Sequence, residues 1–544
     1  MSNPGTVISA SRPSLSRTEI NAAWLILGAA FALSACASLP VDYPRTTSSA
    51  IQGTDAAILG RGIAPLTAAH PEQSGLYPLQ YGMEAFVARL VLAEAAEKSL
   101  DVQYYIWHGD QTGRLLVDRL LRAADRGVRV RLLLDDLGTA ADDADLLALD
   151  AHPNVEVRLF NPVVLRSART LGMLVDFRRI NRRMHNKSFT ADNQATIVGG
   201  RNVGDEYFEA RSDLDFGDLD VMAVGPVVPE VSDAFDLYWN SSAVFPVTAL
   251  TKKRLTPESL TQARAALTAF AESMNDSPYA EALRQSQLAD ELRAGEVPLF
   301  WGRAWLVHDD PAKIAADPED TTTMLLPRLK PVVEQTQSEL LVVSPYFVPG
   351  EAGVKWFQGL RARGIKVRIL TNSLASTDVG AVHAGYARYR EALLRAGVEL
   401  YEVKPGASVR AKDKEDVSGK AGLPGSSRAS LHAKAFAFDR RTVFIGSLNL
   451  DPRSVKLNTE IGVVFESPEL AQLFAAGLER GFEENAWRLE LKPPASRPES
   501  PPSRIEWVTL ENGREVRLTS EPEVSAWRRM SVWFLSLLPI EEQL

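Results

Sequence analysis

One spaced pattern of residues occurs twice in this 544-residue chain and constrains its fold more than any other feature. Each copy follows the order H-x-K-x4-D and continues with G-[GS]-x-N at the same spacing. The two copies consist of His185, Lys187, Asp192, Gly200 and Asn202, and of His432, Lys434, Asp439, Ser447 and Asn449. A pattern of three fixed residue types matches by chance at about 10⁻⁵ per position. Two complete copies therefore indicate an internal duplication.

The segments around the two copies repeat as well. Residues 121–133 return in similar form as residues 360–370. In each half, β-branched runs alternate with helical patterns, which is typical of the α/β class. These elements span residues 100–107, 113–124, 128–134 and 155–160, and residues 340–348, 353–363, 365–370 and 398–403. We predict a duplicated α/β fold with two mixed, mostly parallel sheets, flanked by helices and related by a pseudo-two-fold axis around one shared active site.

The spacing within each copy places its histidine and lysine side by side. Residues i and i+2 of an extended strand point to the same face. Alternating residues around Asp192 and Asp439 predict a hairpin whose turn holds each aspartate. Two copies that meet across the axis would gather two imidazoles, two ammonium groups and two asparagine amides around one cavity. Such a cavity suits a phosphoryl group, with one histidine attacking phosphorus and the other protonating the leaving oxygen.

We expect no metal ion, no cofactor and no nucleic-acid partner. A lysine two residues from each histidine would repel a cation, and the seven histidines show no His-x3-His or Cys/His ligand spacing. The net charge of −9 disfavours a bulk electrostatic grip on nucleic acid. A single cysteine excludes a disulfide framework.

That cysteine, Cys36, ends an N-terminal targeting pattern. Two arginines precede an apolar run over residues 22–33, and residues 33–36 read Leu-Ser-Ala-Cys, which is similar to a bacterial lipobox. We predict a lipoprotein signal peptide over residues 1–35 and a lipid on Cys36. Because residue 37 is Ala rather than Asp, the sorting rule of such lipoproteins implies the outer membrane of a bacterial envelope, facing the periplasm. An ordinary signal peptide and an uncleaved anchor are the alternatives.

Composition divides the rest of the chain. We predict a tether over residues 36–78, a first half over 79–250, a helical connector over 251–299, a second half over 300–492, a proline-rich linker over 493–504, and a hairpin with an amphipathic tail over 505–544. The tail around Trp527 and Trp533 suits either a membrane-interface anchor or a helix docked on the protein's own surface. Six arginines interleaved with apolar residues over 166–183 suit either an entrance for anionic lipid or a helix packed on the body.

The two motifs resemble those of the phospholipase D superfamily, whose H-x-K-x4-D signature occurs twice per active site. The likeness is greatest to bacterial cardiolipin synthases of the C type and their lipoprotein relatives. It is carried further by residues 101–107 (Asp-Val-Gln-Tyr-Tyr-Ile-Trp), 182–187 (Arg-Arg-Met-His-Asn-Lys) and 204–208 (Gly-Asp-Glu-Tyr-Phe), and by the tail, which contains Trp-Arg-Arg and Leu-Leu-Pro-Ile. The resemblance implies a duplicated phospholipase D-like fold in a monomer.

The resemblance also implies roles for the motif residues. His185 would attack the phosphodiester and form a phosphohistidine, and His432 would protonate the leaving alcohol and then deprotonate the incoming one. The residues implied to bind the phosphoryl oxygens are Lys187, Lys434, Asn202, Asn449, Gly200 and Ser447.

Carboxylates are implied to support this chemistry without attacking. Asp192 and Asp439 would do so from behind the reacting groups. A further carboxylate would orient each histidine, and Glu460 and Asp220 fit this role. Asp218 competes with Asp220, because an insertion after Asn202 spoils a gapless match.

By resemblance, the chain is expected to be a membrane-bound phosphatidyltransferase. It would make cardiolipin from phosphatidylglycerol and a second phospholipid, with phosphatidylethanolamine as one candidate donor. A phospholipase D that uses water as acceptor is the nearest alternative, because only the second step differs. A nuclease or other phosphodiesterase and a non-enzymatic envelope lipoprotein are further alternatives.

Overall fold

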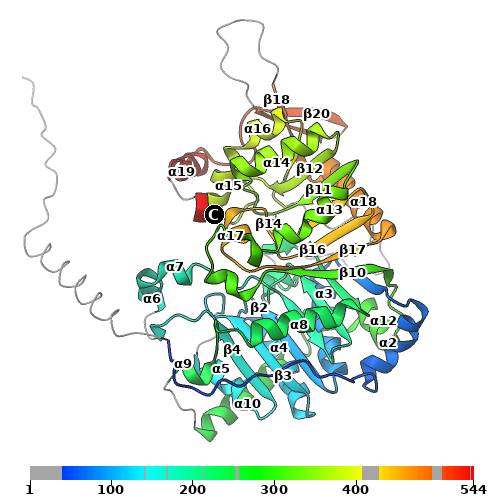
Figure 1. The fold of residues 1–544 in the computed structure, drawn as a ribbon, viewed down its shortest axis with the longest axis vertical. Coiled ribbons are helices and arrows are strands. Elements are labelled where there is room, and N and C mark those ends of the chain that lie inside the picture. Colours follow the sequence, from blue (N-terminus) through cyan, green and yellow to red (C-terminus); the bar gives the residue numbers. More distant parts are fainter. Residues whose placement is uncertain are drawn as a thin grey trace, which may run out of the picture.

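The computed structural model describes residues 39–139, 143–166, 169–211, 214–251, 256–406, 428–492, 505–511, 513–538 and 541–543. Two halves are stacked along the long axis of the molecule (Figure 1). The predicted lipidation site Cys36 and the predicted linker over residues 493–504 lie outside the described residues.

The strands of the first half run in the order β1-β8-β6-β5-β2-β3-β4-β9. Their bounds are β1 (Ser74–Leu79), β2 (Ser99–Tyr104), β3 (Arg129–Asp135), β4 (Val155–Phe160), β5 (Ser188–Ala191), β6 (Ala195–Gly199), β8 (Asp220–Val224) and β9 (Val244–Pro246). Strands β2, β5, β6 and β8 are buried along their whole length. The mostly apolar residues of β6 and β8 fit strands that are covered on both faces.

The second half repeats this order as β10-β17-β16-β15-β11-β12-β13-β18 and adds β19 and β20. The bounds are β10 (Phe300–His308), β11 (Glu339–Val343), β12 (Lys366–Asn372), β13 (Glu399–Val403), β15 (Lys434–Phe438), β16 (Thr442–Gly446), β17 (Ile461–Glu466), β18 (Ala486–Leu491), β19 (Ile505–Glu511) and β20 (Arg514–Leu518). This repetition confirms the predicted duplication.

Two features of the predicted sheets need correction. Within each half, only the central strands pair in parallel. These pairs are β2–β3 and β3–β4 in the first half and β11–β12 and β12–β13 in the second, whereas the flanking pairs are antiparallel. The two halves also do not form separate sheets, because β1 pairs with β10 and joins them into one 18-stranded sheet. The β5–β6 hairpin is antiparallel as predicted, but most antiparallel pairs, such as β2–β5 and β6–β8, join distant segments. Alternation along the sequence does not reveal those partners.

Helices cover the sheet in both halves. Those of the first half are α3 (Gly82–Ala95), α4 (Gln111–Asp125), α5 (Asp143–Asp150), α6 (Arg169–Val175), α7 (Phe177–Ile180), α8 (Val227–Trp239) and α9 (Val247–Leu250). Those of the second half are α13 (Lys330–Gln335), α14 (Gly350–Ala362), α15 (Gly380–Ala387), α16 (Arg390–Arg395), α17 (Pro452–Lys456) and α18 (Pro468–Glu484). Between the halves, α10 (Pro257–Ser273), α11 (Pro278–Arg284) and α12 (Gln287–Ala294) pack on helices of the first half.

The halves share a hydrophobic core where they meet. It contains Leu76, Val198 and Val221 from the first half and Ala435, Ile445 and Ile461 from the second. The side chains of these two groups of residues pack against one another at the junction. Burial of apolar surface therefore fixes the halves against one another.

The predicted tether over residues 36–78 is wrong for its described part. The Ser48 amide donates to Asn240 Oδ1 at 3.1 Å, the Ala50 amide donates to Asp236 Oδ2 at 2.8 Å, and Arg131 Nη1 donates to the Ser48 carbonyl at 3.0 Å. Helix α2 (Ile58–Ala69) and strand β1 follow. The polar composition resembles that of a linker, but side chains of the first half bind its backbone.

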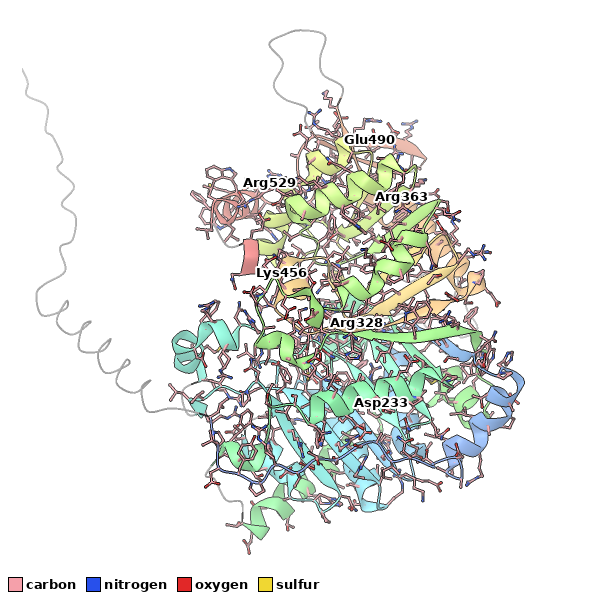
Figure 2. The ribbon with its side chains drawn as sticks, viewed as in Figure 1. Asp233, Arg328, Arg363, Lys456, Glu490 and Arg529 are labelled. Carbon is pink, nitrogen blue, oxygen red and sulfur yellow. The ribbon has the colours of Figure 1, made fainter. Side chains whose placement is uncertain are left out.

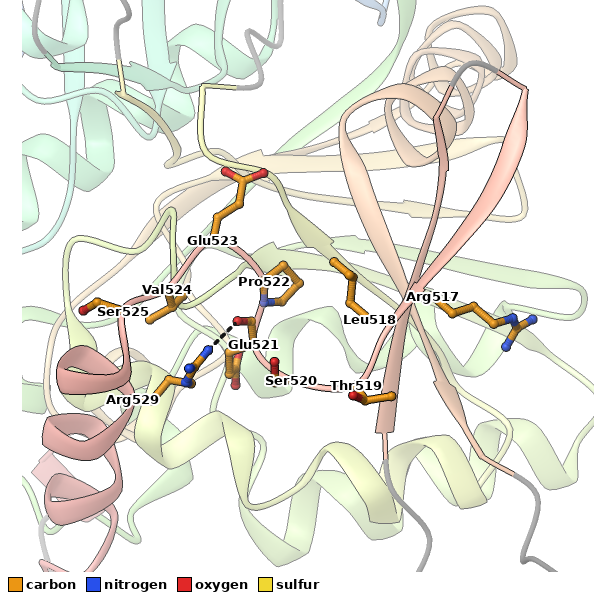
Figure 3. A pocket seen from close by; sticks show the side chains of 10 residues that line it. All are labelled: Arg517, Leu518, Thr519, Ser520, Glu521, Pro522, Glu523, Val524, Ser525 and Arg529. Atoms are coloured by element: carbon orange, nitrogen blue, oxygen red, sulfur yellow. Dashed lines mark hydrogen bonds between the residues drawn. The ribbon is translucent and has the colours of Figure 1, made fainter.

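The C-terminal segment lies on the second half. Strands β19 and β20 form the predicted hairpin, and α19 (Ala526–Ser536) packs on α15. A depression of about 530 Å³ lies along the connecting residues 517–525, where Arg529 Nη1 donates to the Glu521 carbonyl at 3.3 Å (Figure 3). Although α19 is docked, Trp527, Trp533, Phe534 and Leu537 stay 56–72% exposed. Within the described ranges, no helix has the length and apolar character needed to cross a bilayer.

Candidate active site

Backbone pairing between the halves brings the two motifs together. The His185 amide donates to the Thr459 carbonyl at 2.8 Å, and the Thr459 amide donates to the Arg183 carbonyl at 2.9 Å. On the other side, β14 (Arg428–Leu431) pairs in parallel with β7 (Leu214–Gly217), and the His432 amide donates to the Gly217 carbonyl at 2.8 Å. Each histidine therefore enters the site beside a segment of the opposite half.

Each histidine is held by a carboxylate of the opposite half. His185 Nδ1 lies 2.8 Å from Glu460 Oε2, and His432 Nδ1 lies 2.5 Å from Asp218 Oδ2. All four side chains are buried. A carboxylate on Nδ1 fixes the ring orientation and the tautomer, which leaves Nε2 for the reaction. Neither half can build this arrangement alone.

The predicted orienting role of Asp220 is wrong, and Asp218 takes it. Strand register explains the error: Gly199 pairs with Asp220 and Gly446 pairs with Gly462, so Asp218 is the counterpart of Glu460. Asp220 Oδ2 instead accepts from Arg89 Nη2 at 2.8 Å in a fully buried ion pair.

Gly200 and Ser447 were predicted to bind the phosphoryl oxygens. In the structure they lie against the carboxylates that orient the two histidines. A Cβ atom on Gly200 would lie 2.2 Å from Asp218 Oδ1, so only glycine leaves room for that carboxylate. Ser447 Oγ donates to Glu460 Oε2 at 2.5 Å. The difference between glycine and serine in the two motifs therefore follows the difference between Asp218 and Glu460.

Both motif lysines are buried in the same site. Lys187 Nζ donates to the His185 carbonyl at 2.6 Å, and Lys434 Nζ donates to the His432 carbonyl. Burial lowers the pKa of both lysines, and the pKa of Lys187 falls well below its usual range. An anionic phosphodiester beside the two ammonium groups would offset this unfavourable burial.

The two histidine–carboxylate pairs differ in charge. Burial lowers the pKa of His185 well below its usual range, and Lys187 and Lys434 lower it further. Burial also raises the pKa of its partner Glu460 to about 7. In the second pair, burial and Lys434 lower the pKa of His432, whereas the charge of Asp218 raises it. Burial disfavours ionised Asp218, but His432 and Lys434 outweigh burial and hold its pKa below the usual range.

Aromatic rings line both histidines. Tyr105 packs edge-on against His185 at 5.1 Å between ring centroids. Tyr207 and Phe216 pack against His432 at 5.4 and 5.2 Å. These rings were not predicted as site residues, although Tyr105 and Tyr207 lie in stretches that carry the family resemblance.

The backbone before His185 is anchored by a buried ion pair that the sequence analysis also missed. Arg183 Nη2 donates to Asp135 Oδ1 at 2.6 Å, and the Met184 amide donates to Asp135 Oδ2 at 2.9 Å. Both charged side chains are fully buried. The Arg-Arg-Met-His run is the sequence signal that could have indicated it.

The motif asparagines Asn202 and Asn449 are buried. Asn202 Oδ1 accepts from the Ile106 amide at 3.2 Å, which fixes its side chain. Asn449 Oδ1 finds no hydrogen-bond partner among the residues that the structure describes. Buried polar atoms of this kind are expected where a ligand binds.

The motif aspartates do not support the histidines. Asp192 accepts hydrogen bonds from the amides of residues 97, 98 and 99, and Asp439 from those of residues 337, 338 and 339. Both stand at positive φ in the predicted hairpin turns. Their predicted support of the reacting groups is therefore corrected: they anchor the chain that leads into β2 and β11.

Replacing Asp192 with Asn should lower stability and spare the chemistry. The amide retains one acceptor and tolerates the positive φ, but its NH₂ group would face the Glu97 amide. We expect the free energy of unfolding to fall by about 2 kcal/mol in chemical denaturation, with unchanged activity per folded molecule. Asp233→Asn on the exposed face of α8 is the control and should change neither (Figure 2). A selective loss of activity in Asp192→Asn would contradict this assignment.

Comparison with known proteins identifies the family. The family model described as "Cardiolipin synthase, PLD-like domain" matches residues 90–239 and 329–481. Cardiolipin synthase C from Escherichia coli K12 is 46% identical over 485 residues, which cover 89% of this chain and 99% of that protein. The chain belongs to the phospholipase D-like cardiolipin synthase family. Each matched segment of this family member contains one complete histidine–lysine motif.

Other relatives agree with this family assignment. An uncharacterized protein from Helicobacter pylori 26695 is 31% identical over 527 residues, covering 95% of this chain and 99% of that protein. A solved phosphatidylserine synthase from Haemophilus influenzae Rd KW20 has a TM-score of 0.50 at 15% identity, and the match covers 81% of this chain and 95% of that one. At that identity, the solved structure supports the fold alone.

Proposed function

We propose that this chain transfers a phosphatidyl group from one phospholipid to the glycerol headgroup of phosphatidylglycerol and so makes cardiolipin. One observation carries the proposal: two histidines and two lysines from both halves are buried in one site, and each histidine is held by a carboxylate of the opposite half. The similarity to cardiolipin synthase C supports the choice of substrate class.

The proposed reaction has two displacements at phosphorus. In the first, His185 Nε2 attacks the phosphodiester, the bond to the leaving headgroup oxygen breaks, and His432 gives that oxygen a proton. In the second, His432 takes the proton of a phosphatidylglycerol hydroxyl, whose oxygen attacks phosphorus and releases His185. A nucleophile and an acid–base group thereby divide the chemistry.

The charges of the two pairs support this division. Because the pKa of His185 is far depressed, its imidazole is neutral and its Nε2 lone pair is available for attack. The ionised carboxylate of Asp218 opposes the effect of burial and Lys434 on the pKa of His432, so His432 holds a proton more readily than His185 and suits the acid–base role. Lys187 and Lys434 would bind the phosphoryl oxygens and stabilise charge in the transition state.

Lipid products test the proposal. The purified full chain in detergent is incubated with phosphatidylglycerol alone and with added phosphatidylethanolamine, and products are followed by mass spectrometry. Cardiolipin is the expected product, and released glycerol or ethanolamine identifies the donor. Phosphatidic acid without cardiolipin would show that water is the acceptor and would contradict transfer.

We also propose that one side of the molecule contacts the membrane. On this side lie α19 with its exposed Trp527, Trp533 and Phe534, and α7 with Phe177, which is 52% exposed (Figure 1). Asn181 next to α7 donates to Gln543 of the C-terminal turn, which links the two regions. Most of the arginines over residues 166–183 form ion pairs within the protein itself. Arg183, for example, binds Asp135. Exposed aromatic rings are typical of a surface that enters a bilayer interface.

Fluorescence quenching tests this contact. In vesicles of phosphatidylglycerol with brominated acyl chains, tryptophan emission should be quenched in the native protein. The double substitution Trp527→Phe and Trp533→Phe should remove most of that quenching, whereas Trp356→Phe on α14, also exposed, should leave it unchanged. Equal quenching in both variants would contradict the assignment of this face.

The proposed location is the periplasmic face of the outer membrane, with a lipid on Cys36. The lipobox-like sequence supports this proposal, and both motifs in one chain are consistent with a monomer. Labelling of cells with radioactive palmitate should mark the native chain and not Cys36→Ala. Label on the variant would contradict lipidation at Cys36.

A further inference from the structure

A cluster of metal-ligand side chains lies beside the catalytic site and takes no part in the proposed reaction. His108 follows β2, Asp110 caps the N-terminus of α4, and Glu206 lies in the short turn 205–207. His108 Nδ1 lies 3.2 Å from Glu206 Oε1 and 3.9 Å from Asp110 Oδ2. One ligand atom from each residue lies within 4.8 Å of the other two.

An unpartnered carboxylate oxygen points into this cluster. Glu206 is 6% exposed, and its Oε2 is buried without a hydrogen-bond partner in the described part of the chain. A Cβ atom on Gly204 would lie 2.9 Å from His108 Nδ1 and 3.0 Å from Glu206 Oε2. The imidazole and the carboxylate therefore face the same small space, which glycine leaves open. A buried carboxylate oxygen left unpaired is costly unless a ligand satisfies it.

We propose that His108, Asp110 and Glu206 bind a divalent transition-metal ion such as Zn²⁺. One imidazole nitrogen and two carboxylates are a ligand set that zinc accepts, with water completing the coordination. The side chains of His108 and Asp110 are 38% and 26% exposed, so an ion can enter from solvent. The sequence predicts no metal because ligand spacing is recognisable only within one segment, whereas these ligands come from two distant segments.

The ion would strengthen a connection that already exists between two loops of the active site. The His108 amide donates to the Val203 carbonyl at 2.9 Å, and the Asp205 amide donates to Asp110 Oδ2 at 2.8 Å. The second of these loops spans residues 203–207. Asn202 lies directly before it, and Tyr207, which packs on His432, lies at its end. A bound cation would therefore hold an anion-binding amide and an aromatic wall of the site in place.

Direct metal analysis tests the proposal and does not depend on the lipid reaction. The full chain in detergent is stripped with EDTA, equilibrated with Zn²⁺ and desalted, and bound zinc is counted by mass spectrometry. We expect one zinc per chain and a higher Tm. His108→Ala and Glu206→Gln should each lose the zinc and the rise in Tm. His152→Ala should keep both. Its imidazole lies at the same 3.2 Å from a carboxylate, Asp125, but the described residues place no third ligand beside this pair.

X-ray absorption spectroscopy at the zinc edge identifies the ligands of the bound ion in the native protein, so this test holds even if a variant folds poorly. One imidazole with oxygen ligands would support the site. Two imidazoles would indicate binding between His185 and His432 and would overturn it. Absence of bound zinc in the native protein, or retention of zinc by His108→Ala and Glu206→Gln, would overturn it equally.

Discussion

Replacing either His185 or His432 with Ala should lower the rate of phosphatidyl transfer by about 10³-fold or more. Loss of His185 removes the nucleophile, and loss of His432 removes the group that protonates the leaving oxygen. Because the two residues serve consecutive parts of one reaction, the double variant should be little worse than either single variant. Cardiolipin formation per folded molecule measures the effect, with circular dichroism to confirm the fold.

The same experiment tests whether the two halves form a single site. His152→Ala is the matched control, because this imidazole also pairs with a carboxylate but lies away from the site. It should retain full activity. If either His185→Ala or His432→Ala kept more than about a tenth of the activity, one motif would suffice, and the shared site would be contradicted.

The second large effect separates two aspartates that lie two positions apart. Asp218→Asn should lower activity by about 10²- to 10⁴-fold with little loss of stability, because the amide cannot hold the imidazolium of His432 or its tautomer. Asp220→Asn should instead weaken the buried ion pair with Arg89 and lower the free energy of unfolding by about 3 kcal/mol. Its activity per folded molecule should be close to native.

Steady-state kinetics and chemical denaturation of both variants provide the comparison. Arg89→Lys keeps the charge opposite Asp220 but cannot make all the hydrogen bonds of the guanidinium group, such as those to Tyr104 and the Ala85 carbonyl. The protein should therefore lose stability while its activity per folded molecule stays close to native. An inactive Asp220→Asn together with an active Asp218→Asn would contradict the account. It would mean that Asp220, and not Asp218, orients His432, against the register that pairs Gly199 with Asp220.

The duplication and the histidine–lysine pairs could be predicted from sequence because their spacing is local. His185 and Lys187, like His432 and Lys434, are two positions apart in each copy, and strand geometry alone brings them together. It could not be predicted that Asp218 and Glu460 each orient the histidine of the opposite half. This arrangement depends on the pairing of β7 with β14 and on strand register, and residue spacing does not encode either.

Composition predicts the wrong structure where backbone groups find side-chain partners. The polar segment around Ser48 and Ala50 resembles a linker, yet Asn240 and Asp236 bind it to the first half. The resemblance implied that Asp192 supports the chemistry without attacking, and its spacing from His185 is fixed. That spacing arises because a hairpin turn must stand at the end of β5, where the aspartate anchors the start of β2.

Trapping of the covalent intermediate is the most direct test of the central claim, which is that one site built from both halves uses His185 as its nucleophile. The native chain is mixed with phosphatidylglycerol, quenched during turnover at alkaline pH to preserve a phosphohistidine, digested, and mapped by mass spectrometry. We predict a phosphatidyl adduct on the peptide that contains His185 and none on the peptide that contains His432. An adduct on His432, or turnover to cardiolipin without any adduct, would contradict the account.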